Sequence, residues 1–227
     1  TQTKTILMSL KQSFSNLLSF CVNSKIAFSI WSFPNSDKLT AILSDTFTDE
    51  KHCDLTNDKG FCLSKFDNQG NYILLKAKVE LTIDLTNKTI DIISNDERLI
   101  SSEELKTLIY KDVLLDHKVS ISSSFEQTNK EHFIQTVQAV IDQIKTKQFD
   151  KVVVSKFKEE AITNDEIPFL FKRLYEDYPN AFCYLTYIPS DGIWIGATPE
   201  TLLSYDKEQV FKTVALAGTC LLYTSDA

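Results

Sequence analysis

A regular alternation of apolar and polar residues between positions 79 and 85 constrains the fold more than any other feature of this 227-residue sequence. Because successive side chains of a β-strand point to opposite faces, such a run predicts a strand with one buried and one solvated face. The alternating residues are Val79, Glu80, Leu81, Thr82, Ile83, Asp84 and Leu85. Asn87 and Lys88 then predict a turn into a second strand at 89–92, so we expect an antiparallel hairpin here.

Further β-structure is predicted in both halves of the chain. Residues 26–43 form two β-like runs around the turn sequence PNSD at 34–37, which predicts another hairpin. The second half adds five β-branched or aromatic runs, at 151–155, 181–188, 193–197, 201–205 and 210–216. The turn at 189–192 connects two of these runs directly, which favours antiparallel pairing of consecutive strands.

Apolar residues at helical spacing indicate three helices. The three stripes are Phe14, Leu17, Leu18 and Cys21, then Phe133, Val137, Val140, Ile141 and Ile144, and then Ile167, Leu170, Phe171, Leu174 and Tyr178. Asn129 is the expected N-cap of the second helix, Asp165 lies near the start of the third, and Pro168 is tolerated in its first turn. A helix start is also indicated by SSEE at 101–104. These elements predict an α+β fold in which helices cover antiparallel strands.

The charge balance and the hydropathy exclude several classes of function. The 24 Lys and Arg residues are outnumbered by 31 Asp and Glu residues, and the net charge of −7 argues against the basic surface that nucleic-acid binding needs. No run approaches the roughly 18 consecutive apolar residues that a membrane helix requires. The first ten residues lack the pattern of a secretory signal. We therefore expect a cytoplasmic protein that binds neither nucleic acid nor membrane.

The cysteines and histidines predict neither a disulfide framework nor a zinc site. An odd number of scattered cysteines without a C-x-x-C pair favours reduced thiols: Cys21, Cys53, Cys62, Cys183 and Cys220. His52, Cys53 and Cys62 have no fourth ligand nearby, and a polar surface loop is expected there. The sequence also lacks the glycine-rich motifs of dinucleotide-binding and ATP-binding enzymes, so those chemistries are excluded.

Two titratable residues stand where a predicted strand begins or ends. Lys151 opens the apolar run at 151–155, and Glu200 follows GATP at 196–199, a setting in which a carboxylate can project into a cleft. Each residue also has an ordinary explanation, because lysines often end strands and a glutamate after proline is usually solvated. Their positions alone leave a functional and a structural interpretation open.

Four short blocks favour the functional interpretation. They are KVVVSK at 151–156, YPNAFCYL at 178–185, WIGATPE at 194–200 and ALAGT at 215–219. In this order they resemble the chorismate-utilising enzymes, and among them isochorismate synthase, and the resemblance covers residues 133–219. It implies an α+β fold with large antiparallel β-sheets and helices packed outside, and chorismate as the small-molecule substrate.

The resemblance also implies roles for individual residues. Isochorismate synthase moves a hydroxyl group from C4 to C2 of chorismate, which requires a base for the attacking water and an acid for the leaving hydroxyl group. Lys151 matches the family's general base and Glu200 its general acid. Amine-adding relatives typically carry Gln in place of Lys151, and aminodeoxychorismate synthases carry Lys in place of Ala217, so both positions favour water as the nucleophile.

The last block implies a substrate-binding turn and a metal cofactor. Ala217, Gly218 and Thr219 match the turn whose backbone amides meet the substrate's ring carboxylate, although a plain strand end is the alternative there. A free lysine has a pKa of about 10.4, so a base role near neutral pH needs burial or a neighbouring cation. In the family that cation is Mg²⁺, held by carboxylates that the resemblance places beyond residue 219. Lys156 replaces the usual Arg of its block, which weakens an ion pair without touching the acid or the base.

The resemblance predicts how the chain is organised. Residues 1–219 are expected to be the N-terminal part of a single chorismate-binding domain, with a variable β-rich half at 1–124 and the start of the catalytic half at 125–219. The octapeptide CLLYTSDA at 220–227 is interpreted as foreign sequence at a truncated gene end. Such a fragment should be inactive alone, and the intact enzyme is expected to be a monomer.

Other functions stay open at this stage. A salicylate synthase shares the Lys/Glu pair and then eliminates pyruvate from isochorismate. A non-catalytic chorismate-binding or regulatory remnant would keep the fold and lose the metal site. A purely structural interaction module would make the four blocks a coincidence. Menaquinone and siderophore biosynthesis are both compatible destinations for isochorismate.

Overall fold

The computed structural model describes most of the chain as two compact units. Thr1–Val119 and Asp165–Ala227 belong to the first unit, and Ser120–Asn164 forms the second. The described residues are 10–50, 59–64, 72–110, 129–156, 162–163, 166–201, 203–205 and 210–214.

Four helices and eleven strands are present in the described residues. The helices are α1 (Leu10–Ser24), α2 (Ser102–Tyr110), α3 (Lys130–Lys145) and α4 (Glu166–Asp177). The longer strands are β1 (Ala27–Ser32), β2 (Lys38–Ser44), β6 (Val79–Asp84), β7 (Thr89–Asn95), β8 (Phe182–Ile188) and β9 (Gly192–Thr198). The shorter strands are β3 (Phe47–Glu50), β4 (Gly60–Leu63), β5 (Tyr72–Lys76), β10 (Ser204–Tyr205) and β11 (Phe211–Lys212).

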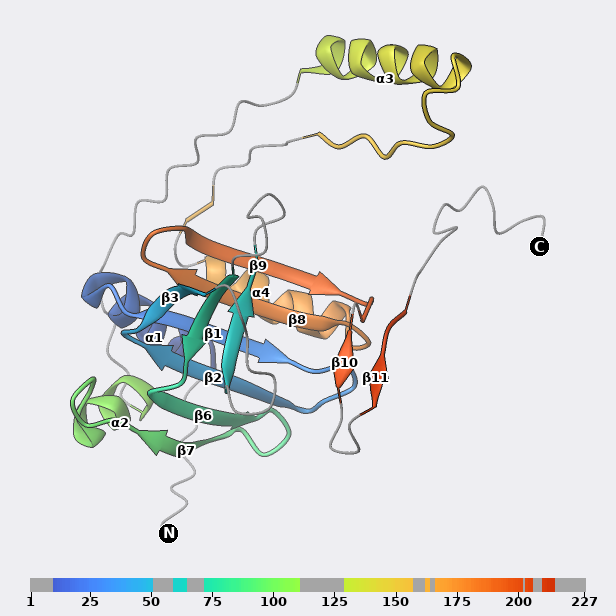
Figure 1. Ribbon diagram of the computed structural model, residues 1–227. Helices are drawn as coiled ribbons and strands as arrows, with labels where there is room; N and C mark the ends of the chain where they lie inside the picture. Colours follow the sequence, from blue (N-terminus) through green and yellow to red (C-terminus); the bar gives the residue numbers. More distant parts are fainter. Residues whose placement is uncertain are drawn as a thin grey trace. The chain divides into compact units, whose positions relative to one another are not determined.

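A six-stranded antiparallel sheet forms the centre of the first unit, in the order β7-β6-β2-β1-β8-β9 (Figure 1). The predicted hairpins β1–β2, β6–β7 and β8–β9 are confirmed. Asn35, in the turn between β1 and β2, has a left-handed φ of 58°, and its N–H donates to the carbonyl of Pro179 at 2.7 Å. This bond ties the first hairpin to the chain just before β8. The α+β fold expected from the sequence is confirmed.

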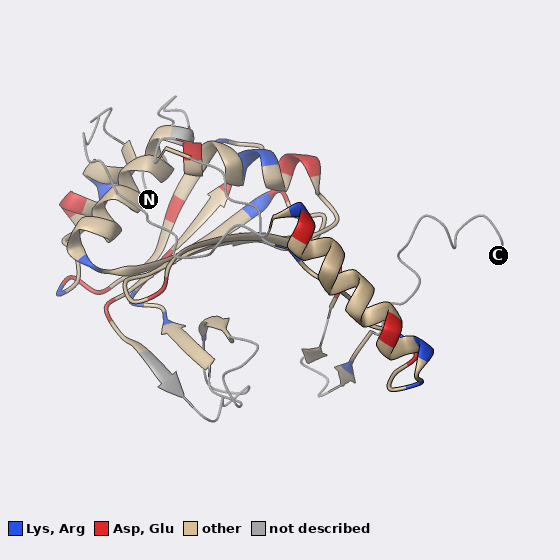
Figure 2. Ribbon diagram, turned by 90° about the horizontal axis from the view of Figure 1, so that it is seen from above, with Lys and Arg blue, Asp and Glu red and all other residues tan. Residues whose placement is uncertain are grey.

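Helices α1, α2 and α4 cover one face of this sheet (Figures 1 and 2). The buried face predicted for β6 is confirmed: Val79, Leu81 and Ile83 are fully buried, and the residues between them are half-buried. They share one core with Leu17 of α1 and Phe171 of α4. The apolar stripes of the helices therefore meet the apolar face of the sheet.

Side chains of α1 donate hydrogen bonds to carbonyl groups at the C-terminal end of α2. The last carbonyl groups of a helix have no partner within the helix itself. Ser13 Oγ donates to the carbonyl of Ile109 at 2.8 Å, and Asn16 Nδ2 donates to the carbonyl of Leu108 at 3.1 Å. Both polar side chains are buried. The sequence predicts α1 from its apolar stripe only, so these two contacts are an addition to that prediction.

The opposite face of the sheet is partly covered by a second, smaller sheet. Its strands pair antiparallel in the order β3-β5-β4. A second apolar cluster joins the two sheets: Ala27, Ile42, Phe61, Ile73, Leu75 and Ile188. β1 is therefore packed on both sides, which explains why five of its six residues are buried and no alternation is visible in its sequence.

The second unit contains α3 and the segment 151–156. Asn129 caps the helix as predicted, and its side chain accepts the N–H of His132 at 2.7 Å. The strand predicted at 151–155 is wrong, because these residues have no regular secondary structure. β-branched residues favour an extended chain, but a strand also needs hydrogen-bond partners on a neighbouring strand, and a sequence pattern does not show whether these are present. None of the residues of α3 is fully buried within the described structure.

Other expectations need smaller corrections. β10 and β11 are two-residue strands, shorter than the runs predicted at 201–205 and 210–216, and residues 215–216 lie outside the described part. The division at residue 124 and the foreign tail at 220–227 stay predictions. None of the described helices is long and apolar enough to cross a membrane.

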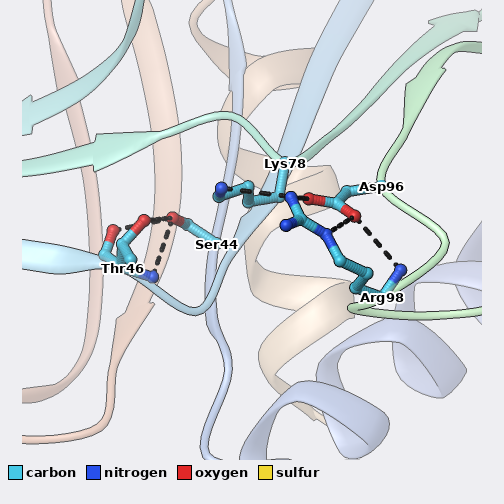
Figure 3. A network of polar contacts seen from close by, with 5 residues as sticks. All are labelled: Ser44, Thr46, Lys78, Asp96 and Arg98. Carbon is cyan, nitrogen blue, oxygen red and sulfur yellow. Dashed lines mark hydrogen bonds and ion pairs between the residues drawn. The ribbon is translucent and has the colours of Figure 1, made fainter.

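A charged cluster links the start of β6 to the turn after β7 (Figure 3). Arg98 donates to the carboxylate of Asp96 from Nε at 2.9 Å and from Nη2 at 2.6 Å, and Lys78 Nζ lies 3.8 Å from the same carboxylate. The hydrogen bonds from Arg98 lower the pKa of Asp96 to about 2, and the positive charges of Arg98 and Lys78 add to this effect. Nearby, Ser44 Oγ donates to the carbonyl of Thr46 at 2.7 Å.

Asp96→Asn should change how stability depends on pH. The pKa of Asp96 falls from its ordinary 3.8 to about 2 on folding, so its contribution is present above about pH 4 and is lost as the pH falls toward 2. The variant should therefore be less stable than wild type at pH 7, and the difference should shrink between pH 4 and 2. Urea unfolding midpoints at several pH values measure this. A difference that does not vary with pH would contradict the assignment.

Two phenylalanines of α4 form a matched pair for testing the core. Phe171 is 1% exposed, with its ring centroid 6.4 Å from that of Phe14, whereas Phe169 is 45% exposed. Phe171→Ala should lower the free energy of unfolding by about 3–5 kcal/mol, because it leaves a cavity in the core. Phe169→Ala should cost no more than about 1 kcal/mol. Equal losses in urea unfolding would show that this helix face is not the buried one.

Candidate functional site

The hairpin β8–β9 brings two of the four sequence blocks side by side. Its register pairs Phe182 with Thr198 and Tyr184 with Gly196. Cys183, between the two aromatic residues, belongs to the core under the helices, whereas Phe182 and Tyr184 pack with the second apolar cluster. The paired residues of the two blocks therefore lie on the sheet face opposite the helices.

A cavity of about 370 Å³ opens on this face, and we call it the aromatic groove. It is lined by Trp31, Phe33, Gly60, Phe61, Cys62, Leu63, Phe182, Tyr184 and Thr198. Its volume lies within the usual range of small-molecule sites, which are mostly apolar with a few polar groups. Thr198, at the end of β9, is a polar residue in this wall.

The aromatic side chains of the groove contact one another in a continuous series. The ring-centroid distances are 5.6 Å for Phe33–Phe182, 6.2 Å for Phe182–Tyr184, 5.8 Å for Phe61–Tyr184 and 5.6 Å for Trp31–Phe61. Tilted ring contacts at these distances are favourable beyond the area that they bury. The wall of the groove is therefore held together by its own side chains.

Gly196 allows one of these rings to lie against β9. A Cβ atom at this position would lie 2.7 Å from three atoms at the far end of the Tyr184 ring, closer than real contacts allow. The glycine of the block at 194–200 is thus explained by a close approach across the sheet rather than by backbone conformation.

Glu200 follows β9 and is held to it through its backbone. The N–H of Glu200 donates to Thr198 Oγ1, and the Thr198 hydroxyl group donates to the carbonyl of Glu200, both at 3.3 Å. The residue itself is exposed. The predicted position at a strand end is confirmed, and the role of general acid stays a prediction.

Lys151 lies in the second unit, at the start of the segment 151–156, and is exposed. Val153, two positions further along the chain, is 85% exposed. At the other end of the segment, Lys156 Nζ lies 6.0 Å from the centroid of the Phe133 ring of α3, at the edge of the range for a cation–π contact. Lys151 and Glu200 belong to different units, and their pairing as base and acid stays a prediction.

Ala217, Gly218 and Thr219 lie outside the described residues, so the substrate-binding turn also stays a prediction. Within the described ranges, no group of three His, Cys, Asp or Glu side chains could hold a metal ion.

Cysteine chemistry does not add to the site. The described part of the chain contains Cys21, Cys62 and Cys183, and no disulfide bond joins any two of them. Burial raises the pKa of the Cys21 and Cys183 thiols, so both act as neutral packing groups. Cys62 lies on β4 in the wall of the groove, which corrects the expectation that it belongs to a polar loop.

The sequence patterns did not predict the groove. Three of its aromatic residues, Trp31, Phe33 and Phe61, come from the first half of the chain, which the four blocks do not cover. Trp31 and Phe33 are two positions apart, a spacing that puts both side chains on one face of an extended chain. This spacing is the feature of the sequence from which an aromatic surface could have been predicted.

Comparison with known proteins gives one match to a family. A family model described as chorismate binding enzyme matches residues 47–225, more than three quarters of the chain. The match begins at β3 and includes Lys151, Glu200 and the block at 215–219. No curated protein matches the chain.

Proposed function

The chain belongs to the chorismate-binding enzyme family, and from this premise we propose that it is an isochorismate synthase. The proposed reaction converts chorismate to isochorismate by adding water at C2 and releasing the hydroxyl group of C4. The family match supports a chorismate-converting enzyme, and the four sequence blocks favour this reaction over amine addition.

The position of Glu200 carries the proposal. Its backbone is bonded to Thr198, which itself lines a cavity of about 370 Å³. The Glu200 residue is exposed, two positions beyond the cavity wall. We propose that, from a backbone held next to the cavity wall, the carboxyl group of Glu200 reaches a bound small molecule and exchanges a proton with it.

The proposed mechanism assigns one proton transfer to each residue. Lys151 Nζ accepts a proton from water as the water oxygen forms its bond to C2. The carboxyl group of Glu200 donates its proton to the C4 hydroxyl group, which leaves as water while the ring double bonds shift. One water is consumed and one is released, so the reaction is an isomerisation without change of oxidation state.

Lys151→Ala and Glu200→Gln should stop the chemistry while chorismate still binds. Each variant removes one proton transfer, and the expected loss in kcat is about 100-fold or more. Separation of the products formed from chorismate measures isochorismate, and calorimetry measures the Kd of chorismate, both in the complete gene product.

Matched controls use charged surface residues of the same types. Lys145→Ala and Glu176→Gln remove exposed partners of helix-surface ion pairs with Asp142 and Lys172, and should keep wild-type rates. Wild-type rates in either site variant would contradict the assignment. Release of pyruvate by the wild-type protein would identify a salicylate synthase instead, and binding without conversion would identify a non-catalytic chorismate-binding protein.

Mg²⁺ is proposed as the cofactor on the resemblance alone. When bound, it would supply positive charge that neutralises the substrate's carboxylate. Treatment of the complete gene product with EDTA should abolish isochorismate formation, and added Mg²⁺ should restore it. Unchanged turnover after removal of divalent cations would show that no metal is needed.

A further inference from the structure

Thr198 lines the groove, and its hydroxyl group is hydrogen-bonded to the backbone of Glu200. The residue is paired across the sheet with Phe182. Its hydroxyl group accepts the N–H of Glu200 and donates to the carbonyl of the same residue, at 3.3 Å in both cases. A hydroxyl group has one donor and two acceptor sites, so both bonds can form at once.

The neighbouring residues restrict the chain on both sides of Thr198. Pro199 fixes its own φ at about −65° and has no N–H to donate. Two residues before Thr198, the ring of Tyr184 lies against Gly196, and the Tyr184 ring contacts Phe61 and Phe182 at centroid distances of 5.8 and 6.2 Å. The path of the chain toward Glu200 is thus tied to the wall of the groove.

We propose that Thr198 is a positioning residue for Glu200. The Thr198 hydroxyl group holds the Glu200 backbone in the position from which the Glu200 carboxyl group reaches the substrate. This inference rests on the proposed function, in which Glu200 is the general acid. A proton donor must lie within hydrogen-bond reach of its acceptor, and a displacement of about 1 Å can cost on the order of 100-fold in rate. Loss of the hydrogen bonds that hold the Glu200 backbone should therefore lower kcat more than it weakens substrate binding.

Two substitutions separate the hydroxyl group from the rest of the side chain. Thr198→Val keeps the branched shape that suits a strand end and removes both hydrogen bonds. Thr198→Ser keeps the hydroxyl group and removes the methyl group. If the hydroxyl group positions Glu200, the Val variant loses function and the Ser variant retains it, whereas a packing role gives the opposite order.

Steady-state kinetics of the complete gene product with chorismate test the positioning role. Thr198→Val should lower kcat about tenfold with KM within about twofold, and Thr198→Ser should stay within about twofold of wild type. The matched control is Thr107→Val on α2, which removes a hydroxyl bond to the carbonyl of Glu103 at 2.9 Å and should keep wild-type kinetics. An unchanged kcat in Thr198→Val, or equal losses in the Val and Ser variants, would overturn the proposal.

Amide hydrogen exchange at Glu200 tests these hydrogen bonds without turnover. Loss of the bond to Thr198 Oγ1 should speed exchange of the Glu200 N–H about fivefold in Thr198→Val, and Thr198→Ser should match wild type. Equal exchange in all three proteins would also overturn the proposal. If the wild-type protein does not convert chorismate, the result contradicts the proposed function and, with it, the role of Thr198 in catalysis. If the wild-type protein converts chorismate and Thr198→Val does so equally well, the result contradicts the positioning role alone.

Discussion

The pairing of β1 with β8 is the interaction on which the rest of the structure depends. It makes neighbours of residues 28–32 and 183–187, and the hydroxyl group of Thr186 adds a buried bond to the carbonyl of Phe28, 158 positions away in the chain. Closing so long a loop costs conformational entropy. The burial of five of the six residues of β1, between two apolar layers, offsets that cost.

This pairing builds the core and the candidate site together. Cys183 and Leu185 point into the core under the helices, and Phe182 and Tyr184 point to the opposite face, where Trp31 from β1 joins them. β9 takes its position from β8, so the location of the chain toward Glu200 follows from the same register. A shift of one residue between β1 and β8 would move the core residues to the groove and the groove residues to the core.

Local sequence patterns were enough for most helices and strands. The alternation in β6, the Asn129 cap and the apolar stripe around Phe171 each express a preference that adjacent residues can satisfy. The strand expected at 151–155 shows the limit of such patterns, because β-branched residues favour an extended chain and only a partner strand makes it a β-strand. The hydrogen bonds of Ser13 and Asn16 to α2 were not predicted for a related reason, because the partner of a small polar side chain depends on how the helices pack.

Taken alone, the sequence predicted an α+β fold of antiparallel strands and proposed a lysine and a glutamate as catalytic residues, because residue types and short spacings are local properties. The folded chain added what depends on distance. Aromatic residues from both halves form one groove, the Tyr184 ring lies against Gly196, and the Thr198 hydroxyl group is hydrogen-bonded to the backbone of Glu200. The groove and the contact of Tyr184 with Gly196 follow from strand register and sheet packing, which bring together residues that no local pattern connects.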